Sequence, residues 1–374
     1  MSKDMLFTIP VAATFAGTVK LAELLKTPPL HPIVTGALLF ILTEAPRSIR
    51  DTALATLSKY AAPSTITASI KALKALFTLG LARQLHNYLT LLAQNNFRLT
   101  SEAKNYNWPH EIALVTGAAG GIGAAIVTDL AAKGLTVIAV DIAPELPPAL
   151  AKLPKVHYHR CDITDRAAVM ELRDTIQKTH GHVSILVNNA GLAFAHHTLN
   201  ASETALRKLW DVNIVSHYWT AQAFLPSMIA NRKGHVVSTA SMASFYPGAG
   251  LGPYSGTKVA VLNLHESLAQ ELRPIHRCPE ILLTIVHPTF VSTAMTRAVK
   301  AELEKKQTVI TPQDVSRGIC RNVFAGRGGQ VVLSGSLGWV PTVIRCLPWW
   351  VQYSLVRAVE PVKVEVPEVE TPLK

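Results

Sequence analysis

From Glu111 onward, short apolar segments alternate with longer segments of helical pattern. Short apolar segments between turn residues predict buried β-strands, and their alternation with helices predicts right-handed βαβ crossovers. Such crossovers build a parallel sheet with helices on both faces, so the predicted fold class is α/β, a doubly wound parallel sheet. The predicted strands are residues 112–115, 135–140, 156–159, 183–187, 235–238, 281–286 and 330–333.

The two ends of the chain differ from this central region. Residues 1–93 are rich in Leu, Ala and Thr, and they form a predicted apolar helical region. Within it, residues 64–93 are the clearest helix, whose apolar face either packs on the next domain or lies on a membrane surface. The predicted domains are 1–93, a polar linker at 94–110, the α/β domain at 111–335, and an apolar C-terminal helix and tail at 336–374.

No segment of the chain predicts a bilayer-crossing helix or a secretory signal. Residues 27–43 contain three prolines, and their apolar part, 33–42, is half the roughly 20 residues that a crossing helix needs. A re-entrant, interfacial or buried role for this segment stays open. Residues 337–359 place Trp, Tyr and Arg beside aliphatic residues, which suits a lipid headgroup boundary. The alternative is a helix that covers a substrate pocket or forms a homodimer contact.

The chain is basic, with a formal net charge of +11 over 374 residues, but its Lys and Arg residues are scattered. Nucleic-acid binders cluster such charge on one face, so nucleic acid is not a predicted partner. A weak attraction to anionic membrane surfaces fits better. The four cysteines lie far apart in no metal-ligand spacing, and we expect free thiols and no metal site.

A glycine-rich turn follows the first predicted strand and opens a helix. It contains Gly117, Gly121, Ile122 and Gly123, and Asp141 ends the second strand 18 residues beyond Gly123. Glycines let the backbone approach a pyrophosphate at a helix N-terminus, which is typical of a Rossmann-type dinucleotide site. A carboxylate at Asp141 can accept the ribose hydroxyls and would repel a 2′-phosphate, so NAD(H) is favoured and NADP(H) is possible. The alternative role for Asp141 is a turn or helix-capping carboxylate.

Tyr254 and Lys258 stand four residues apart and share one face of a predicted helix. Hydride transfer needs a group that exchanges a proton with the substrate oxygen, and a free tyrosine with a pKa near 10 is a poor base. A nearby ammonium favours the phenolate. Ser241 lies 13 residues before Tyr254, after the fifth strand, where its hydroxyl can hold the reacting oxygen; Ser238 is its competitor. Taken alone, a tyrosine at this spacing is more often a core or rim residue.

Together, these motifs resemble the short-chain dehydrogenase/reductase family over about residues 111–335. Residues 188–191 read Asn-Asn-Ala-Gly, a family signature that supports the sheet and borders the cofactor. Gly120 also permits the glycine spacing of an epimerase-like branch, but the other motifs indicate the dehydrogenase branch. The resemblance implies cofactor contacts at Asn189, Ala190 and Gly191, and an adenine contact at Asp162.

The resemblance also implies roles for three further residues. Asn213 matches the family's fourth catalytic residue, which supports a water relay to Lys258. The backbone at Val291 and the hydroxyl of Thr293 match the contacts to the nicotinamide carboxamide. The sequence around these residues, 287–295, is similar to that of the family branch that includes retinol and 17β-hydroxysteroid dehydrogenases. Members of that branch are often attached to membranes or lipid droplets.

The sequence therefore predicts an oxidoreductase that transfers a hydride between a nicotinamide cofactor and a lipophilic alcohol, ketone or aldehyde of retinoid, steroid or fatty-alcohol type. We expect association with an endoplasmic reticulum or lipid-droplet surface, with the catalytic domain facing the cytosol, and a homodimer is an open option. Two alternatives remain: a soluble carbonyl reductase of secondary metabolism, and a non-catalytic scaffold on a lipid surface. The substrate-selecting loops carry no motif, so substrate and reaction direction are not predicted.

Overall fold

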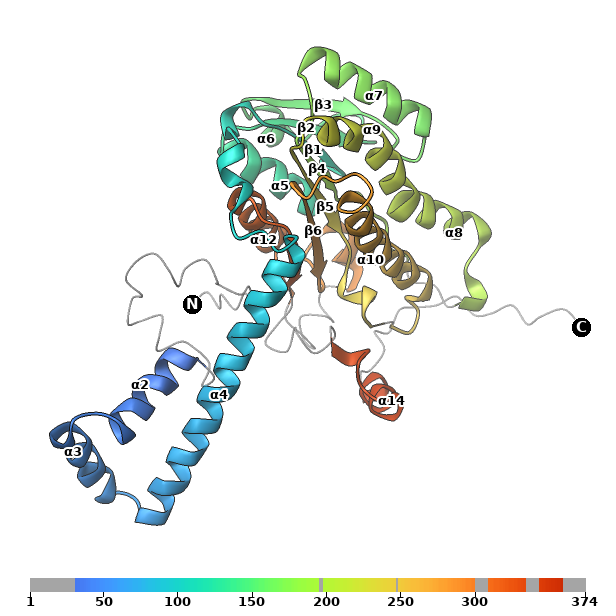
Figure 1. Cartoon of the computed structure of the whole chain (residues 1–374). Coiled ribbons are helices and arrows are strands. Elements are labelled where there is room, and N and C mark those ends of the chain that lie inside the picture. The colour runs from blue at the N-terminus through green and yellow to red at the C-terminus, as the bar shows by residue number, and fades with distance from the viewer. Residues whose placement is uncertain (1–30, 195–197, 247, 300–308, 334–342, 359–374) are drawn as a thin grey trace, which may run out of the picture. The chain divides into compact units, whose positions relative to one another are not determined.

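The computed structural model describes residues 31–194, 198–246, 248–299, 309–333 and 343–358. The described chain forms two units that divide between Gln94 and Asn95, an all-helical unit and a larger α/β unit (Figure 1). Parts of four predicted segments lie outside the described residues. They are positions 1–30 of the N-terminal region, 300–308 of the loop that the sequence predicts to cover the substrate (294–311), 334–342 at the junction of the α/β domain and the C-terminal segment, and the tail at 359–374.

The α/β unit is built on one sheet of seven strands in the order β3-β2-β1-β4-β5-β6-β7. All six strand pairs are parallel, which confirms the predicted doubly wound sheet. The inner strands are buried along their whole length because helices cover both faces of the sheet. The strands are β1 Ile112–Thr116, β2 Thr136–Asp141, β3 Val156–Arg160, β4 Ile185–Asn188, β5 Gly234–Thr239, β6 Ile281–Pro288 and β7 Gly329–Leu333.

Helices lie on both faces of this sheet (Figure 1). On one face, Ile126 and Leu130 of α5 pack with Val315 and Ile319 of α12 over the strands. On the other face, α7, α9 and the end of α10 form a second core. The helices are α5 Gly121–Ala132, α6 Pro148–Ala151, α7 Arg166–Thr179, α8 Glu203–Trp210, α9 Ser216–Ala230, α10 Gly252–Leu272, α12 Pro312–Ala325 and α14 Trp349–Ala358. Shorter turns are the 3-10 helices η1 Glu102–Asn105, η2 Trp108–His110, η3 Thr198–Asn200, η5 Met242–Ser244 and η6 Ala294–Val299, and the π-helix η4 Asp211–Val215.

Helix α12 has no counterpart among the elements that the sequence predicts. It begins with a capping box, in which the Thr311 side chain accepts from the Asp314 N–H and the Asp314 side chain accepts from the Thr311 N–H. It ends at Gly326, whose φ of 57° is the left-handed conformation that glycine adopts easily. The pattern Thr-Pro-x-Asp and the closing glycine were therefore the signals that could have located this helix.

The predicted polar linker is fixed on the α/β unit from Asn95 onward. The amide of Asn95 donates to the carbonyl oxygen of Gly328 at 3.0 Å and accepts from the Gly328 N–H at 2.8 Å. The hydroxyl of Ser101 donates to the carbonyl oxygen of Ala325 at 2.5 Å. Tyr106 is buried in the core of the α/β unit. The segment thus connects the units in sequence, and its polar side chains serve to dock it rather than to keep it in solvent.

The helical unit consists of α2 Pro32–Thr43, α3 Arg47–Ser58 and α4 Pro63–Gln94. Helices α2 and α4 pack closely at Gly36, where a Cβ atom would lie only 2.8 Å from the ring of Phe77. Gly80 is the one residue of α4 that the structure describes as buried. The expected apolar face therefore packs partly on α2, while Leu81 and Tyr88 remain exposed.

By length and composition alone, α4 is able to cross a bilayer, which corrects the prediction that the chain has no such helix. Its 32 residues extend about 48 Å, more than the roughly 30 Å of a hydrocarbon core. Helices α2 and α3 pass the same test only as one pair, bent by 98°. The sequence pattern of residues 64–93 predicts only a packed or membrane-surface helix, since an apolar face with Lys71 and Arg83 off its centre does not by itself distinguish a surface helix from a spanning one.

We predict that Gly326→Ala destabilises the α/β unit far more than Gly134→Ala. Both glycines have a positive φ, but a Cβ at Gly326 would collide with the Ala103 backbone, whereas the nearest atom to a Cβ at Gly134 is 4.0 Å away. Backbone strain alone costs about 1 kcal/mol, and the collision adds roughly 1–3 kcal/mol. Denaturant unfolding of the two variants measures the difference, and equal losses would contradict the docking of residues 101–103 on α12.

Candidate active site

The glycine-rich turn lies at the C-terminal end of β1, where it lets α5 start close to the strand. Gly117 and Gly121 have φ values of 65° and 54°, in the region that favours glycine. A Cβ at Gly123 would collide with the carbonyl oxygen of Gly117, so the turn excludes any larger side chain there. Ile122 follows in the first turn of α5. This exposes the N-terminal N–H groups of α5 at the sheet edge, which fits the binding of a pyrophosphate.

The Asn-Asn-Ala-Gly segment ties the end of β4 to the end of β1. The Thr116 hydroxyl accepts from the N–H groups of Asn189 and Ala190 at 3.0 and 3.1 Å. The Asn189 amide donates to the carbonyl oxygen of Thr116 at 3.0 Å, and Asn188 accepts from the Thr220 hydroxyl at 2.8 Å. Strands β1 and β4 flank the point where the strand order reverses, which is where doubly wound sheets bind ligands.

Asp141 ends β2 with its carboxylate turned toward the glycine-rich turn. One carboxylate oxygen accepts from the Ala119 N–H at 2.9 Å and the other accepts from the Ala143 N–H at 3.1 Å. Because a carboxylate has about four acceptor sites, two remain for a ligand. Asp141 therefore bonds the backbone of both neighbouring turns and can still accept hydrogen bonds from the hydroxyls of a ribose. Asp162 is exposed at the end of β3, where it accepts from the N–H and the hydroxyl of Thr164.

Helix α10 brings Tyr254 and Lys258 together beside β5. The ammonium of Lys258 is buried, donates to the carbonyl oxygen of Thr239 at 2.8 Å and lies 5.7 Å from the centre of the Tyr254 ring. Burial lowers the pKa of Lys258 to about 8. Burial also raises the pKa of Tyr254, and a hydrogen bond with Ser241 acts in the opposite direction. The phenol is therefore protonated in the resting protein.

Ser241, and not Ser238, is the serine that reaches Tyr254. Ser238 is an integral residue of β5 and is buried. Ser241 follows the strand and caps η5, where its hydroxyl accepts from the Ala243 N–H at 3.2 Å. A hydroxyl that ends a strand and contacts a phenol can hold a substrate oxygen between the two groups.

Asn213 lies in the π-helix between α8 and α9, within the segment 202–231 that the sequence predicts as mostly helical. Its amide forms two hydrogen bonds with the backbone of Leu192: it accepts from the N–H at 2.7 Å and donates to the carbonyl oxygen at 2.9 Å. It also donates to the hydroxyl of Thr257 at 3.0 Å. The side chain thus clamps the segment after β4 to α10. A Cβ at Gly191 would lie 3.4 Å from the Asn213 amide oxygen and 3.6 Å from the Lys258 nitrogen, so these three residues are adjacent.

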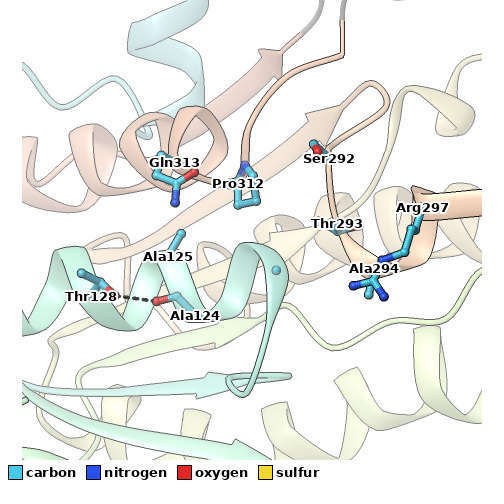
Figure 2. Close-up of a pocket in the computed structure, with 10 residues that line it drawn as sticks. Ala124, Ala125, Thr128, Ser292, Thr293, Ala294, Arg297, Pro312 and Gln313 are labelled. Carbon is cyan, nitrogen blue, oxygen red and sulfur yellow. Dashed lines mark hydrogen bonds between the residues drawn. The ribbon is translucent and has the colours of Figure 1, made fainter. Parts of the chain in front are cut away.

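Val291 and Thr293 follow β6 and complete the edge of the site. Val291 is buried and forms a parallel bridge with Ile310. A Cβ at Gly121 would lie 3.2 Å from the side chain of Thr293, so Thr293 stands directly over the glycine-rich turn. A cavity of about 570 Å³ opens here between α5, residues 292–297 and the start of α12 (Figure 2). Arg297 lines it and provides a positive charge near the N-terminus of α5.

Two buried histidines near Lys258 were not singled out from the sequence. His217 and His287 are both buried, and the positive charge of Lys258 contributes to lowering the pKa of each. His287 is hydrogen-bonded at both ring nitrogens, to the carbonyl oxygen of Ser241 at 3.0 Å and to the Gln330 amide at 3.1 Å. His217 stands four residues after Asn213, a helical spacing that could have pointed to it.

Comparison with known proteins decides which family shares this arrangement. Residues 111–304 match the model of the short chain dehydrogenase family. The chain belongs to this family. It is therefore an NAD(P)-dependent oxidoreductase, and the glycine-rich turn, Asp141 and the Asn-Asn-Ala-Gly segment fit a dinucleotide at the switch point of the sheet.

Its relatives include fungal and animal dehydrogenases. Dehydrogenase RED2 of Cochliobolus heterostrophus is 37% identical over 202 residues, which cover 54% of this chain and 75% of that protein. Epidermal retinol dehydrogenase 2 of Mus musculus is 32% identical over 237 residues, covering 62% of this chain and 76% of that protein. Estradiol 17-beta-dehydrogenase 11 of Pongo abelii is 28% identical, covering 64% and 79%.

Solved structures show the same fold. A metagenomic short-chain oxidoreductase in complex with NADP superposes with a TM-score of 0.52 at 26% identity, covering 61% of this chain and 98% of that chain.

All four cysteines are free thiols, three of them buried. Within the described part of the chain, no group of three or more His, Cys, Asp or Glu side chains is arranged to hold a metal ion.

We predict that Asn213→Ala lowers the free energy of unfolding by about 2–4 kcal/mol, because it leaves the N–H and the carbonyl of the half-buried Leu192 and the buried hydroxyl of Thr257 without the amide that they bond. Asn231→Ala is the matched control, since that exposed amide bonds only the Ser227 carbonyl of its own helix. Chemical denaturation measures both. A loss at position 213 no larger than at position 231 would show that the clamp is not structural.

Proposed function

We propose that the protein is an NAD(H)-dependent dehydrogenase that interconverts a lipophilic alcohol with its ketone or aldehyde at a membrane surface. The observation that carries this proposal is the convergence of Ser241, Tyr254 and Lys258 at the carboxyl end of β5, where Lys258 also lies next to Gly191. These groups come from different elements, η5 and α10, and a chance Tyr-x-x-x-Lys pair would not bring a strand-ending serine to the phenol.

Tyr254 is the proposed acid and base of the reaction. Its protonated phenol donates to a carbonyl oxygen during reduction and, as phenolate, accepts from a hydroxyl during oxidation. Ser241 holds the same substrate oxygen, and its hydrogen bond opposes the effect of burial on the pKa of Tyr254. Lys258 places a positive charge near the ring and orients the cofactor ribose. The cofactor, when bound, supplies the carbon that takes or gives the hydride. Asn213 holds Leu192 and Thr257 in place around this group.

The preference for NAD(H) rests on Asp141, whose carboxylate faces the glycine-rich turn through the Ala119 N–H. A 2′-phosphate at this position would meet like charge. Arg160 stands beside Asp141 in the register of β2 and β3, and its Nε donates to the Ile142 carbonyl at 3.2 Å. This cation is the local feature that favours NADP(H), and we expect the carboxylate to outweigh it because Asp141 bonds the glycine-rich turn directly, whereas Arg160 bonds the backbone after β2.

A lipophilic substrate is supported by the relatives that are named for retinol and estradiol. Exposed aromatic side chains on α14, with Trp349 at 75% and Trp350 at 71% exposure, add a surface suited to a headgroup boundary. Helix α4 is able to anchor the protein. A soluble carbonyl reductase is the second candidate, but it does not explain the exposed apolar residues of α4 and α14. A scaffold without activity does not explain why Ser241, Tyr254 and Lys258 lie together.

We predict that Tyr254→Phe lowers kcat by roughly 10²–10⁴-fold while NADH binding is retained, because only the proton-exchanging hydroxyl is lost. Purified protein in detergent would be assayed with retinoid, steroid and aliphatic alcohols against both cofactors. Tyr246→Phe is the control, since it removes an equivalent hydroxyl from a tyrosine outside the group. Unchanged turnover in Tyr254→Phe would remove the catalytic assignment of this site.

We predict that Asp141→Ser raises the NADP(H)-to-NAD(H) ratio of kcat/KM by at least about tenfold, because it removes one negative charge and leaves Arg160 in place. The double variant Asp141→Ser/Arg160→Ala should lose most of this gain. Asp162→Ser is the control at the neighbouring strand end. A wild-type enzyme that already prefers NADP(H) would overturn the assignment of Asp141.

We predict that the full chain stays in the membrane fraction after carbonate washing and is released by detergent, because α4 has the length and composition of a spanning helix. Introducing two charges with Leu81→Lys and Leu85→Lys, which are both exposed on α4, should release much of the protein. Leu199→Lys, at a still more exposed leucine of the α/β unit, is the control. Release of the wild type by carbonate alone would favour the soluble reductase.

A further inference from the structure

The short helix η5, which follows Ser241, is held in place by contacts from distant parts of the chain. The carbonyl oxygen of Ser241 is hydrogen-bonded to Nδ1 of His287, on β6, at 3.0 Å. The Ser244 hydroxyl donates to the carbonyl oxygen of Lys258 at 2.9 Å, which ties η5 to α10. These two bonds fix the start and the last residue of η5 relative to the strand and the helix that flank the site.

The backbone at the far end of η5 is bonded by Arg345, which lies 100 residues later in the chain. The Nε of Arg345 donates to the carbonyl oxygen of Phe245, the C-cap residue of η5, at 2.9 Å. The last carbonyls of a helix have no partner within that helix, and a basic side chain can bond them. Phe245 is buried, and its ring centre lies 4.5 Å from that of His287. Arg345 therefore closes the helix beside the histidine that bonds Ser241.

Arg345 belongs to the C-terminal segment, beyond the part of the chain that the family model matches. The match ends at residue 304, so it assigns no role to Arg345. The neighbouring Ile344 is 6% exposed, so the segment is packed at this point, whereas Arg345 itself is an exposed residue. An exposed side chain adds little to the hydrophobic core. Its contact with η5 therefore acts mainly on the position of that helix.

We propose that Arg345 is a positioning residue for the reaction, which fixes the end of η5 and thereby keeps the Ser241 hydroxyl in reach of Tyr254 and of the substrate oxygen. The inference rests on the proposed function, in which Ser241 holds that oxygen. Because η5 has only three residues and the Ser241 hydroxyl accepts from the Ala243 N–H within it, a shift of its far end also moves the hydroxyl. A misplacement of about 1 Å at a reacting group can cost roughly 10²-fold in rate.

Loss of this bond should loosen η5 without changing the cofactor site. A hydrogen bond from a charged donor is strong enough that its removal favours the open states of the turn at least about tenfold. Asp141 and the glycine-rich turn are bonded to each other at the ends of β2 and β1, away from η5 in the sequence and on other strands. The affinity for NADH should therefore stay at its wild-type value. A general loss of folded protein would instead lower turnover and NADH binding in the same proportion.

The test compares Arg345→Met and Arg345→Lys in the full chain in detergent, with retinol, estradiol and dodecanol as probe alcohols. We expect Arg345→Met to lower kcat at least about tenfold and to leave NADH affinity, measured by fluorescence, unchanged. Amide exchange of residues 241–246, measured by mass spectrometry, should become at least about tenfold faster. Arg345→Lys restores a charged donor and should recover most of both effects.

Gln352→Met is the matched control, because the amide of Gln352 bonds the carbonyl oxygen of Leu347 within the same C-terminal segment. It should leave both kcat and the exchange of residues 241–246 at wild-type values. Equal exchange rates in Arg345→Met and Gln352→Met, or wild-type kcat in Arg345→Met, would overturn the role of Arg345. If the wild type oxidises none of the three alcohols while exchange is still faster in Arg345→Met, the proposed function fails and the support of η5 by Arg345 stands.

Discussion

The site depends on a buried ammonium held by a strand end. Lys258 donates to the carbonyl oxygen of Thr239, the last residue of β5, and burial lowers its pKa to about 8. This bond fixes α10 against the sheet edge and, with it, the position of the Tyr254 ring one turn earlier. A buried charge is costly unless hydrogen-bond acceptors surround it, so polar groups such as the Thr239 carbonyl serve to stabilise the ammonium of Lys258.

Those groups come from elements that are distant in sequence and meet only because the sheet is parallel. The carboxyl ends of β1, β4 and β5 lie at one edge, where Thr116 holds the segment after β4 and Thr239 holds Lys258. The π-helix before α9 turns Asn213 toward Leu192, and such local widening of a helix is frequent at functional sites. The edge that fits a dinucleotide is thus the edge that holds Tyr254, the proposed proton-exchanging group.

Much of this could be predicted from the sequence, for reasons that particular residues make clear. Apolar strands and the glycine-rich turn identify the fold because they need no knowledge of distant partners. The contacts of Asn213 with Leu192 and Thr257 could not be predicted, because they depend on how an irregular turn of helix places its side chain against α10. The predicted elements do not include helix α12, although Thr311 and Gly326 mark its ends. The sequence places Asn95 in a linker, since a polar side chain gives no sign that it will bond Gly328.

The most direct measurement of this account is a carbon NMR titration of Lys258 in protein labelled with ¹³C at the lysine ε position, with the signal assigned through Lys258→Arg. A buried ammonium supported by Thr239 should titrate with a midpoint near 8, about two units below an ordinary lysine. A midpoint near 10.4, the value of a solvent-exposed lysine, would show that Lys258 is not buried at the strand end and would contradict the site described above.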